Sequence, residues 1–224
     1  MGVNIEGKRM TNPLSGKAVD VDRVLLVRYP ESLTTRDLAK ESQTSVGEVS
    51  KVSRALVNQM LAIRESSRSA LKLMDPSSLL TRLAAIRNFV ADTKFIEYYT
   101  SEDDISKFLS RLKEIHGPKY AVTGLAAALF FAPFVRPTNV HIYVKTEDDA
   151  RELANRLDLM PVEKNGNVKF AIAKDDGVFY GGLEIDGVNL VSPQQLYLDL
   201  RNYPARGEEA ANEVYKVIAH NWGT

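Results

Sequence analysis

The order of elements between Leu33 and Met74 constrains this chain more than any other feature of its sequence. Thr34 precedes a short helical pattern and has a carboxylate, Asp37, three residues later, which is the pattern of a capping box. A polar turn follows, and then a second helical pattern that Ser45 can cap. Two short apolar runs with a polar, basic segment between them are typical of a β-hairpin. The order helix, turn, helix and hairpin predicts a winged helix-turn-helix.

The second helix of this stretch has an apolar side and a polar side. Its apolar residues recur three and four positions apart, which predicts one buried stripe formed by Val46, Val49, Val52 and Leu56. The small, hydroxyl and basic residues beside the stripe should face solvent. Such side chains suit a close approach to phosphates and base edges. The candidate DNA contacts of the turn and this helix are Thr44, Ser45, Ser50, Lys51 and Arg54.

The hairpin supplies a second group of candidate DNA contacts. Its predicted tip is the polar segment 64–69, and a lysine lies in the second strand. A wing of this kind usually touches the sugar-phosphate backbone, where cations contribute sequence-independent affinity. We therefore expect phosphate contacts from Arg64, Arg68 and Lys72. The alternative is that the winged helix serves as a protein-interaction module and that its basic face is only solvated.

Charge is distributed unevenly along a chain whose formal net charge is zero. Residues 1–90 contain 14 Lys and Arg against 9 Asp and Glu, whereas residues 91–224 contain 15 against 20. A basic half joined to an acidic half indicates that the first half binds a polyanion. The sequence has no cysteine, and no apolar run reaches the roughly 18 residues of a membrane span. We expect a cytoplasmic protein that does not bind membranes.

The chain is long enough for two domains with cores of their own. We expect a flexible arm over residues 1–16, the winged helix-turn-helix over 17–75 and a connector helix over 76–92. The apolar stripe of the connector is formed by Leu79, Leu83, Ile86 and Val90. Residues 93–224 alternate between helical and strand patterns, which predicts a mixed α/β domain. The predicted fold class is therefore α+β.

One arrangement in the second domain resembles the nucleotidyltransferase fold. Thr123 and Gly124 lie at a strand-to-helix junction, and another strand follows about fifteen residues later. In nucleotidyltransferases that strand carries two carboxylates, one residue apart, which hold Mg²⁺. Here the strand offers Asn139 and His141 instead. Because a hard divalent cation needs anionic oxygen ligands, we predict a degenerate fold with no metal site, no cofactor and no enzymatic activity.

Two groups of charged residues in the second domain have competing interpretations. The acids at 147–149 follow the same strand, and we interpret them as the first turn of a helix, where negative charge is favourable. An active nucleotidyltransferase would instead use them as metal ligands. A possible functional cluster in this acidic domain consists of Arg136, Arg201 and Arg206. These arginines could equally form ion pairs with Asp199, Glu208 and Glu209.

Four segments of the second domain resemble a known family. They are residues 120–128 (YAVTGLAAA), 132–137 (APFVRP), 191–200 (VSPQQLYLDL) and 204–211 (PARGEEAA). These segments are similar to those of the AbiEi antitoxins, the transcriptional regulators of type IV toxin-antitoxin systems. The resemblance implies an N-terminal DNA-binding domain that represses its own operon. It also implies a C-terminal domain that opposes a nucleotidyltransferase toxin without forming a stable complex with it.

The residues and the resemblance together predict a cytoplasmic transcriptional regulator whose partner is double-stranded DNA. A single winged helix contacts only a few base pairs, and two half-sites are the usual way to gain specificity. We therefore expect a monomer in solution that pairs on an inverted repeat in its own promoter. A nucleotidyltransferase-fold enzyme and a protein-interaction module with a vestigial winged helix remain the alternatives.

Overall fold

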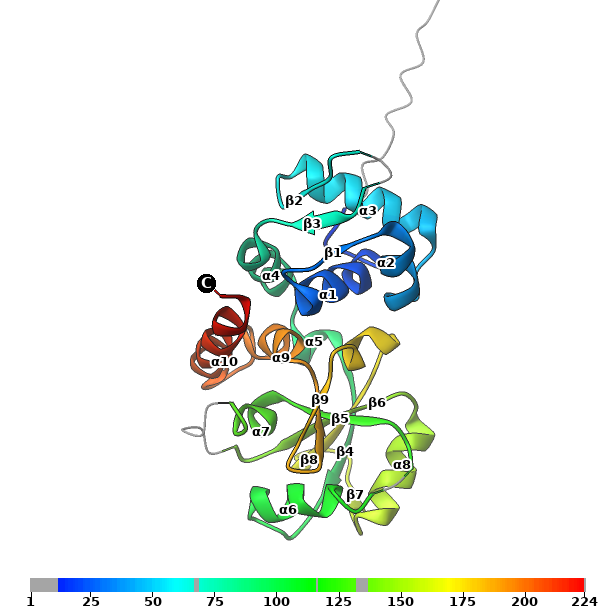
Figure 1. Cartoon of the computed structure of the whole chain (residues 1–224). Coiled ribbons are helices and arrows are strands. Elements are labelled where there is room, and N and C mark those ends of the chain that lie inside the picture. Colours follow the sequence, from blue (N-terminus) through cyan, green and yellow to red (C-terminus); the bar gives the residue numbers. More distant parts are fainter. Residues whose placement is uncertain (1–11, 67–68, 116, 132–136, 224) are drawn as a thin grey trace, which may run out of the picture. The chain divides into compact units, whose positions relative to one another are not determined.

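The computed structural model describes residues 12–66, 69–115, 117–131 and 137–223. The chain divides into an N-terminal unit, residues 1–79, and a C-terminal unit, residues 80–224 (Figure 1). Most of the predicted arm lies outside the described residues. Within those residues, no helix combines the length and the apolar character needed to cross a membrane.

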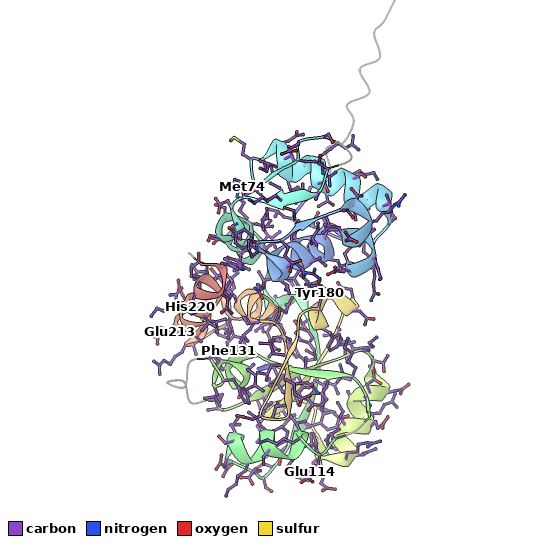
Figure 2. The ribbon with its side chains drawn as sticks, in the orientation of Figure 1. Met74, Glu114, Phe131, Tyr180, Glu213 and His220 are labelled. Carbon is purple, nitrogen blue, oxygen red and sulfur yellow. The ribbon has the colours of Figure 1, made fainter. Side chains whose placement is uncertain are left out.

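The described residues of the N-terminal unit form helices and a small antiparallel sheet. Its elements are α1 (Ala18–Arg28), β1 (Ser32–Leu33), α2 (Thr35–Glu41), α3 (Val46–Asn58), β2 (Ala62–Ile63) and β3 (Leu71–Leu73). The strands pair in the order β1-β3-β2, and the three helices pack against one another. Leu38 of α2 and Leu56 of α3 are fully buried in this core. Met74, directly after β3, is half-exposed and lies on the outside of the unit (Figure 2).

Side-chain caps set the start of α2 and of α3. The Thr34 hydroxyl accepts a hydrogen bond from the backbone N–H of Asp37, and the Asp37 carboxylate accepts one from the N–H of Thr34. The predicted capping box is therefore confirmed. The Ser45 hydroxyl accepts a hydrogen bond from the N–H of Glu48, so the predicted cap of the second helix is also confirmed.

The predicted connector, a single helix over residues 76–92, is wrong. The structure has two helices there, α4 (Pro76–Ala85) and the short α5 (Phe89–Asp92). The predicted apolar stripe is divided by this break, because Ile86 lies beyond the end of α4. Both Ile86 and Val90 are exposed rather than buried.

Two asparagine side chains explain the break between α4 and α5. The Asn88 side chain caps α5 by accepting a hydrogen bond from the N–H of Ala91. The Asn202 amide donates hydrogen bonds to the carbonyl oxygens of Ala84 and Arg87, at 2.8 and 2.6 Å. These bonds engage carbonyl groups at and just after the end of α4, where the Ala84 carbonyl also accepts a hydrogen bond from the N–H of Arg87.

The C-terminal unit is built on a seven-stranded mixed sheet with the strand order β7-β4-β8-β6-β5-β10-β9. The pairs β6–β8 and β5–β10 are parallel, and the others are antiparallel. Its strands are β4 (Lys94–Tyr99), β5 (Tyr120–Thr123), β6 (Val140–Val144), β7 (Met160–Pro161), β8 (Val168–Ile172), β9 (Leu183–Ile185) and β10 (Val188–Leu190). Beside α5, its helices are α6 (Ile105–Leu112), α7 (Gly124–Ala128), α8 (Glu147–Arg156), α9 (Pro193–Leu200) and α10 (Gly207–Trp222), with a 3-10 turn at Asp176–Phe179.

Helices cover both sides of this sheet. Figure 1 shows α5 and α9 on one side and α6 and α8 on the other. Helices α7, α9 and α10 pack together, α5 packs on α9, and α8 contacts β4 and β6. All five residues of β6 are buried, so this strand lies in the core. The predicted mixture of helices and sheets is therefore confirmed.

Candidate functional site

Helix α3 has a buried side and a solvent-facing side. Val49, Val52 and Leu56 are fully buried, so three of the four predicted core positions are confirmed. Successive residues are turned by about 100° along a helix, which places the outward residues on one arc. This arc, termed the α3 outer face, consists of Val46, Gly47, Ser50, Lys51, Arg54, Val57 and Asn58, all exposed or half-exposed. It carries hydroxyl and basic side chains, and the carboxylate of Glu48 borders it beside Lys51.

Two predictions about exposure near the start of α3 are wrong. Thr44, predicted to face solvent, is buried, and its hydroxyl donates a hydrogen bond to the carbonyl oxygen of Ser42. Val46, predicted to be buried, is 52% exposed. Because Ser45 caps the helix, Val46 is its first residue and lies at the edge of the outer face, about 60° from Val49.

The two cations of the outer face are exposed and only loosely held. Lys51 Nζ lies 3.2 Å from a carboxylate oxygen of Glu48, one turn earlier. Arg54 Nε donates to the carbonyl oxygen of Ser50 at 3.3 Å. An exposed ion pair of this kind contributes little stability, so exchanging it for a phosphate costs little. The face can therefore offer both cations to an anionic partner.

The basic residues of the hairpin lie in different environments. Lys72, in β3, is exposed. Arg64 is half-buried, and its Nη2 lies 3.3 Å from Thr35 Oγ1 and 3.4 Å from Ser53 Oγ. Burial lowers the pKa of Arg64. Arg68 lies outside the described residues. The phosphate contacts expected from this hairpin stay predictions.

The Thr-Gly junction of the C-terminal unit adjoins a buried polar cluster around Asp199 of α9. Thr123 ends β5, and its hydroxyl donates a 2.7 Å hydrogen bond to Asp199 Oδ2. Tyr143 of β6 and Gln195 of α9 donate to Asp199 Oδ1 at 3.2 and 2.7 Å. The four side chains are buried and join β5, β6 and α9.

Burial raises the pKa of Asp199 to about 6, although its hydrogen bonds and the nearby charge of Arg87 act in the opposite direction. Desolvation disfavours the charged form of a carboxyl group. The three donors partly replace the lost hydration of the carboxylate. Asp199 is thus a structural centre whose oxygens are already engaged.

His141, on β6, is one of the two strand residues expected in place of a nucleotidyltransferase carboxylate pair. Its ring packs edge-on against Phe89, Phe95 and Tyr203, with centroid distances of 5.5, 5.6 and 5.5 Å. Burial lowers the pKa of His141 to about 4, so the imidazole is neutral at pH 7. A Cβ atom at Gly124 would lie only 3.2 Å from His141 Nδ1. Aromatic packing fills this position.

The residues around the Thr-Gly junction do not fit a divalent-cation site. Mg²⁺ prefers anionic oxygen ligands, whereas Asn139 and His141 supply an amide and a neutral imidazole. The acids at 147–149 form the first turn of α8, as predicted, because Thr146 and Asp149 make a capping box. Within the described part of the chain, no group of three or more His, Asp or Glu side chains could hold a metal ion.

The predicted arginine cluster is occupied by ion pairs where the structure describes it. Arg201 lies 2.5 Å from Glu208, and Arg206 lies 2.7 Å from Glu209. Both glutamates belong to the first turn of α10, where negative charge is favourable. Arg136, the third member, lies outside the described residues.

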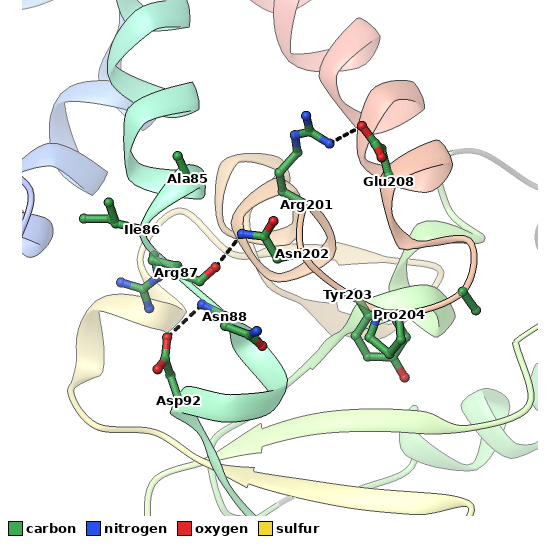
Figure 3. A pocket seen from close by; sticks show the side chains of 11 residues that line it. Ala85, Ile86, Arg87, Asn88, Asp92, Arg201, Asn202, Tyr203, Pro204 and Glu208 are labelled. Atoms are coloured by element: carbon green, nitrogen blue, oxygen red, sulfur yellow. Dashed lines mark hydrogen bonds and ion pairs between the residues drawn. The ribbon is translucent and has the colours of Figure 1, made fainter.

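A cavity of about 690 Å³ lies between the end of α4 and the loop after α9 (Figure 3). Figure 3 shows three of its polar contacts: Asn202 with the carbonyl group of Arg87, Asn88 with Asp92, and Arg201 with Glu208. Its lining includes two cations, Arg87 and Arg201, and two carboxylates, Asp92 and Glu208. The cavity therefore presents mixed charge and does not select one sign of ligand.

Sequence reasoning missed the Asp199 cluster. One signal was present, since Gln195 and Asp199 are four residues apart in a helix that Ser192 and Pro193 begin. That spacing puts both polar side chains on the same side of an otherwise apolar helix. Their partner Thr123 is distant in the chain and gives no such signal.

Comparison with known protein families shows which family the chain belongs to. The family model described as the transcriptional regulator AbiEi antitoxin of type IV toxin-antitoxin systems matches residues 72–219. The match spans nearly all of the C-terminal unit and only the end of the N-terminal unit. Comparisons with curated proteins and with solved structures found no match. The chain belongs to the AbiEi antitoxin family of transcriptional regulators of type IV toxin-antitoxin systems.

Proposed function

We propose that this chain is a DNA-binding transcriptional repressor and that its N-terminal unit is a winged helix-turn-helix. The element order and the pairing β1-β3-β2 support this assignment, with α2 and α3 as the helix pair and the β2–β3 hairpin as the wing. In such domains the second helix of the pair lies in the major groove of DNA. Helix α3 is therefore the proposed recognition helix.

The observation that carries the proposal is the composition of the α3 outer face. Ser50, Lys51 and Arg54 are turned outward, while the apolar residues of the same helix are buried. Hydroxyl groups and cations can contact phosphates and base edges. A vestigial winged helix that binds proteins would not need a helix face on which two cations are exposed and only one carboxylate, Glu48, lies nearby. The proposed contacts of this region are Ser45, Ser50, Lys51 and Arg54.

The wing is proposed to bind the sugar-phosphate backbone. Lys72 is exposed on β3 and is the best supported of these contacts. Arg64 and Arg68 complete the proposed group. Such contacts neutralise phosphates and release counterions, so they increase affinity for all sequences about equally.

The C-terminal unit is proposed to have a nucleotidyltransferase-like sheet without transferase activity. The succession β5, Thr123-Gly124, α7 and β6 supports the likeness, and the residues Asn139 and His141 support the loss of activity. Membership of the antitoxin family supports a role against a nucleotidyltransferase toxin. We propose that this role does not require a stable complex with the toxin.

The proposed target is the promoter of the protein's own operon. A single winged helix contacts few base pairs, whereas two half-sites one helical turn apart give a longer and more specific site. We therefore propose that the protein is a monomer in solution and that two copies bind an inverted repeat.

A binding titration tests the proposed function. Fluorescence anisotropy would follow the full-length chain with a duplex from its own upstream region and with a scrambled duplex, at several salt concentrations. The double variant Lys51→Ala with Arg54→Ala should bind the upstream duplex at least about fivefold more weakly, because one base contact contributes roughly 1–3 kcal/mol.

The matched control is Lys216→Ala. Lys216 forms an exposed ion pair with Glu213, three residues earlier on α10, just as Lys51 does with Glu48. This control should leave the affinity unchanged. If the double variant bound as tightly as the wild type, α3 would not be the recognition helix.

A further inference from the structure

We infer that Val46 is a specificity-determining residue that contacts the 5-methyl group of thymine in the major groove. The inference rests on the proposed DNA binding by α3. It adds a base preference that neither the family nor the basic character of the face provides.

The exposure of Val46 is unusual for its helix. Val49 and Val52 are fully buried, whereas Val46 is 52% exposed. Ser45 caps α3 through the N–H of Glu48, which fixes Val46 as the first helical residue. The N-terminal residues of a recognition helix are those that contact base edges. An apolar side chain is thus displayed at the position closest to the bases.

The surroundings of Val46 favour a close approach to DNA. The next residue is Gly47, where an added Cβ atom would meet only Ser45 Oγ, at 3.9 Å. The outer face therefore has no bulk beside the valine. Ser50 and Arg54 follow at intervals of four residues, so the three side chains lie along one line of the helix.

The chemistry of valine restricts what it can recognise. Its side chain has neither donor nor acceptor, so it cannot bond to phosphates or to the polar edges of bases. The thymine methyl group is the apolar feature that the major groove offers, and apolar side chains contact it. A β-branched side chain is also stiff at χ1, so little rotamer freedom is lost on binding. Valine therefore suits thymine.

Other exposed apolar residues of the N-terminal unit do not share this position. Met60 follows the end of α3, Ile63 lies in β2, and Met74 follows β3. None of them belongs to the α3 outer face. Met60 is 84% exposed and provides a control with similar hydrophobic character.

Uracil-substituted DNA tests the inference, because uracil pairs as thymine does and lacks only the methyl group. The upstream duplex would be prepared with thymine throughout or with uracil throughout. Both duplexes would be titrated with the wild type, with Val46→Ala and with Met60→Ala. The wild type should bind about fourfold more weakly for each contacted methyl group that is removed.

The combination of variant and duplex isolates the contact, as in a double-mutant cycle. Val46→Ala should bind the thymine duplex more weakly and should lose little more affinity on the uracil duplex. Met60→Ala should discriminate between the duplexes as the wild type does.

Two outcomes would overturn the inference alone. One is equal binding of both duplexes by the wild type, and the other is full discrimination retained by Val46→Ala. Specific binding of the upstream duplex over the scrambled one would still support the proposed function in both cases. Absence of specific binding by the wild type would overturn the proposed function together with the inference.

Discussion

The hydroxyl of Thr123 donates a 2.7 Å hydrogen bond to Asp199, 76 residues later in the chain. This bond fastens the end of β5 to α9 inside the C-terminal unit. Because both groups are buried, the bond forms where the local dielectric constant is low and an unpaired carboxylate would be costly. The same carboxyl group makes the stability of the unit depend on pH.

Replacing Asp199 by asparagine should make stability fall more steeply in acid. Burial raises the pKa of Asp199 from 3.8 to about 6, so this group contributes stability below about pH 4 and loses it as the pH rises through 6. Asp199→Asn removes that contribution, which changes by about 3 kcal/mol between pH 4 and pH 6. Urea unfolding between pH 4 and 7 measures it. The control is Asp186→Asn, because Asp186 is exposed. If the free energy of unfolding of Asp199→Asn depended on pH just as that of the wild type does, the raised pKa of Asp199 would be refuted.

Replacing His141 by glutamine should have the opposite effect. Burial lowers the pKa of His141 from 6.5 to about 4, so its contribution is present above pH 6.5 and is lost as the pH falls through 4. In His141→Gln the free energy of unfolding should rise relative to the wild type as the pH is lowered, by about 3 kcal/mol over this range. The same urea titrations measure it. A variant that follows the wild type throughout would contradict the buried, neutral histidine.

Alanine at Gly124 should destabilise the C-terminal unit by about 1–3 kcal/mol. Gly124 has a φ of +65°, and an added Cβ atom would press on the His141 ring at 3.2 Å. Gly47→Ala is the matched contrast, because Gly47 lies in α3 with open space around it. It should stabilise the N-terminal unit by up to about 1 kcal/mol, the value for a helix interior, because Gly47 lies in the first turn of α3. Thermal unfolding measures both changes. Equal shifts of the melting temperature in Gly124→Ala and Gly47→Ala would contradict the strain assigned to Gly124.

Neutralising Lys72 should reduce the salt dependence of DNA binding. Because Lys72→Gln removes one cation from the phosphate backbone, the slope of log affinity against log salt should fall by roughly 1, for specific and scrambled duplexes alike. Arg64→Gln tests the other described wing residue in the same titration and should give the same reduction. Lys216→Gln serves as the control. A change of sequence preference without a change of slope would count against the wing assignment.

The protein should not transfer nucleotides. Incubation with labelled nucleotide triphosphates, Mg²⁺ and RNA should give no labelled product, and calorimetry should detect no tight binding of Mg²⁺ with nucleotide. The physical reason is the strand with Asn139 and His141, which supplies no carboxylate pair. Transfer that disappeared in Asp148→Asn or Asp149→Asn would show that these acids are metal ligands after all.

Local sequence patterns predicted local structure well. The caps at Thr34, Ser45 and Thr146 were all predictable, because a hydroxyl side chain and the N–H three residues later lie within one helical turn. The periodicity of α3 gave the correct buried residues beyond its first turn. It failed at Val46, because periodicity gives the direction of a side chain but not how far the core extends along the helix.

Contacts between distant residues were beyond such patterns. The stripe from Leu79 to Val90 has helical spacing throughout, yet the helix ends at Ala85. Part of the cause is Asn202, whose amide reaches carbonyl groups more than 100 residues earlier. The role of Asp199 was unpredictable for the same reason, since its partner Thr123 belongs to another strand.

The pairing of Lys51 with Glu48 has a consequence for selectivity in the proposed DNA complex. In the free protein the Lys51 ammonium group already has an anion 3.2 Å away, so a phosphate must replace a carboxylate rather than bulk water. Glu48 also repels phosphates that approach without the correct register. The affinity for arbitrary DNA is lowered more than the affinity for the specific site, because base contacts at the specific site offset the repulsion. In the proposed complex Glu48 would therefore lower the affinity for arbitrary DNA only slightly, because an exposed ion pair contributes little.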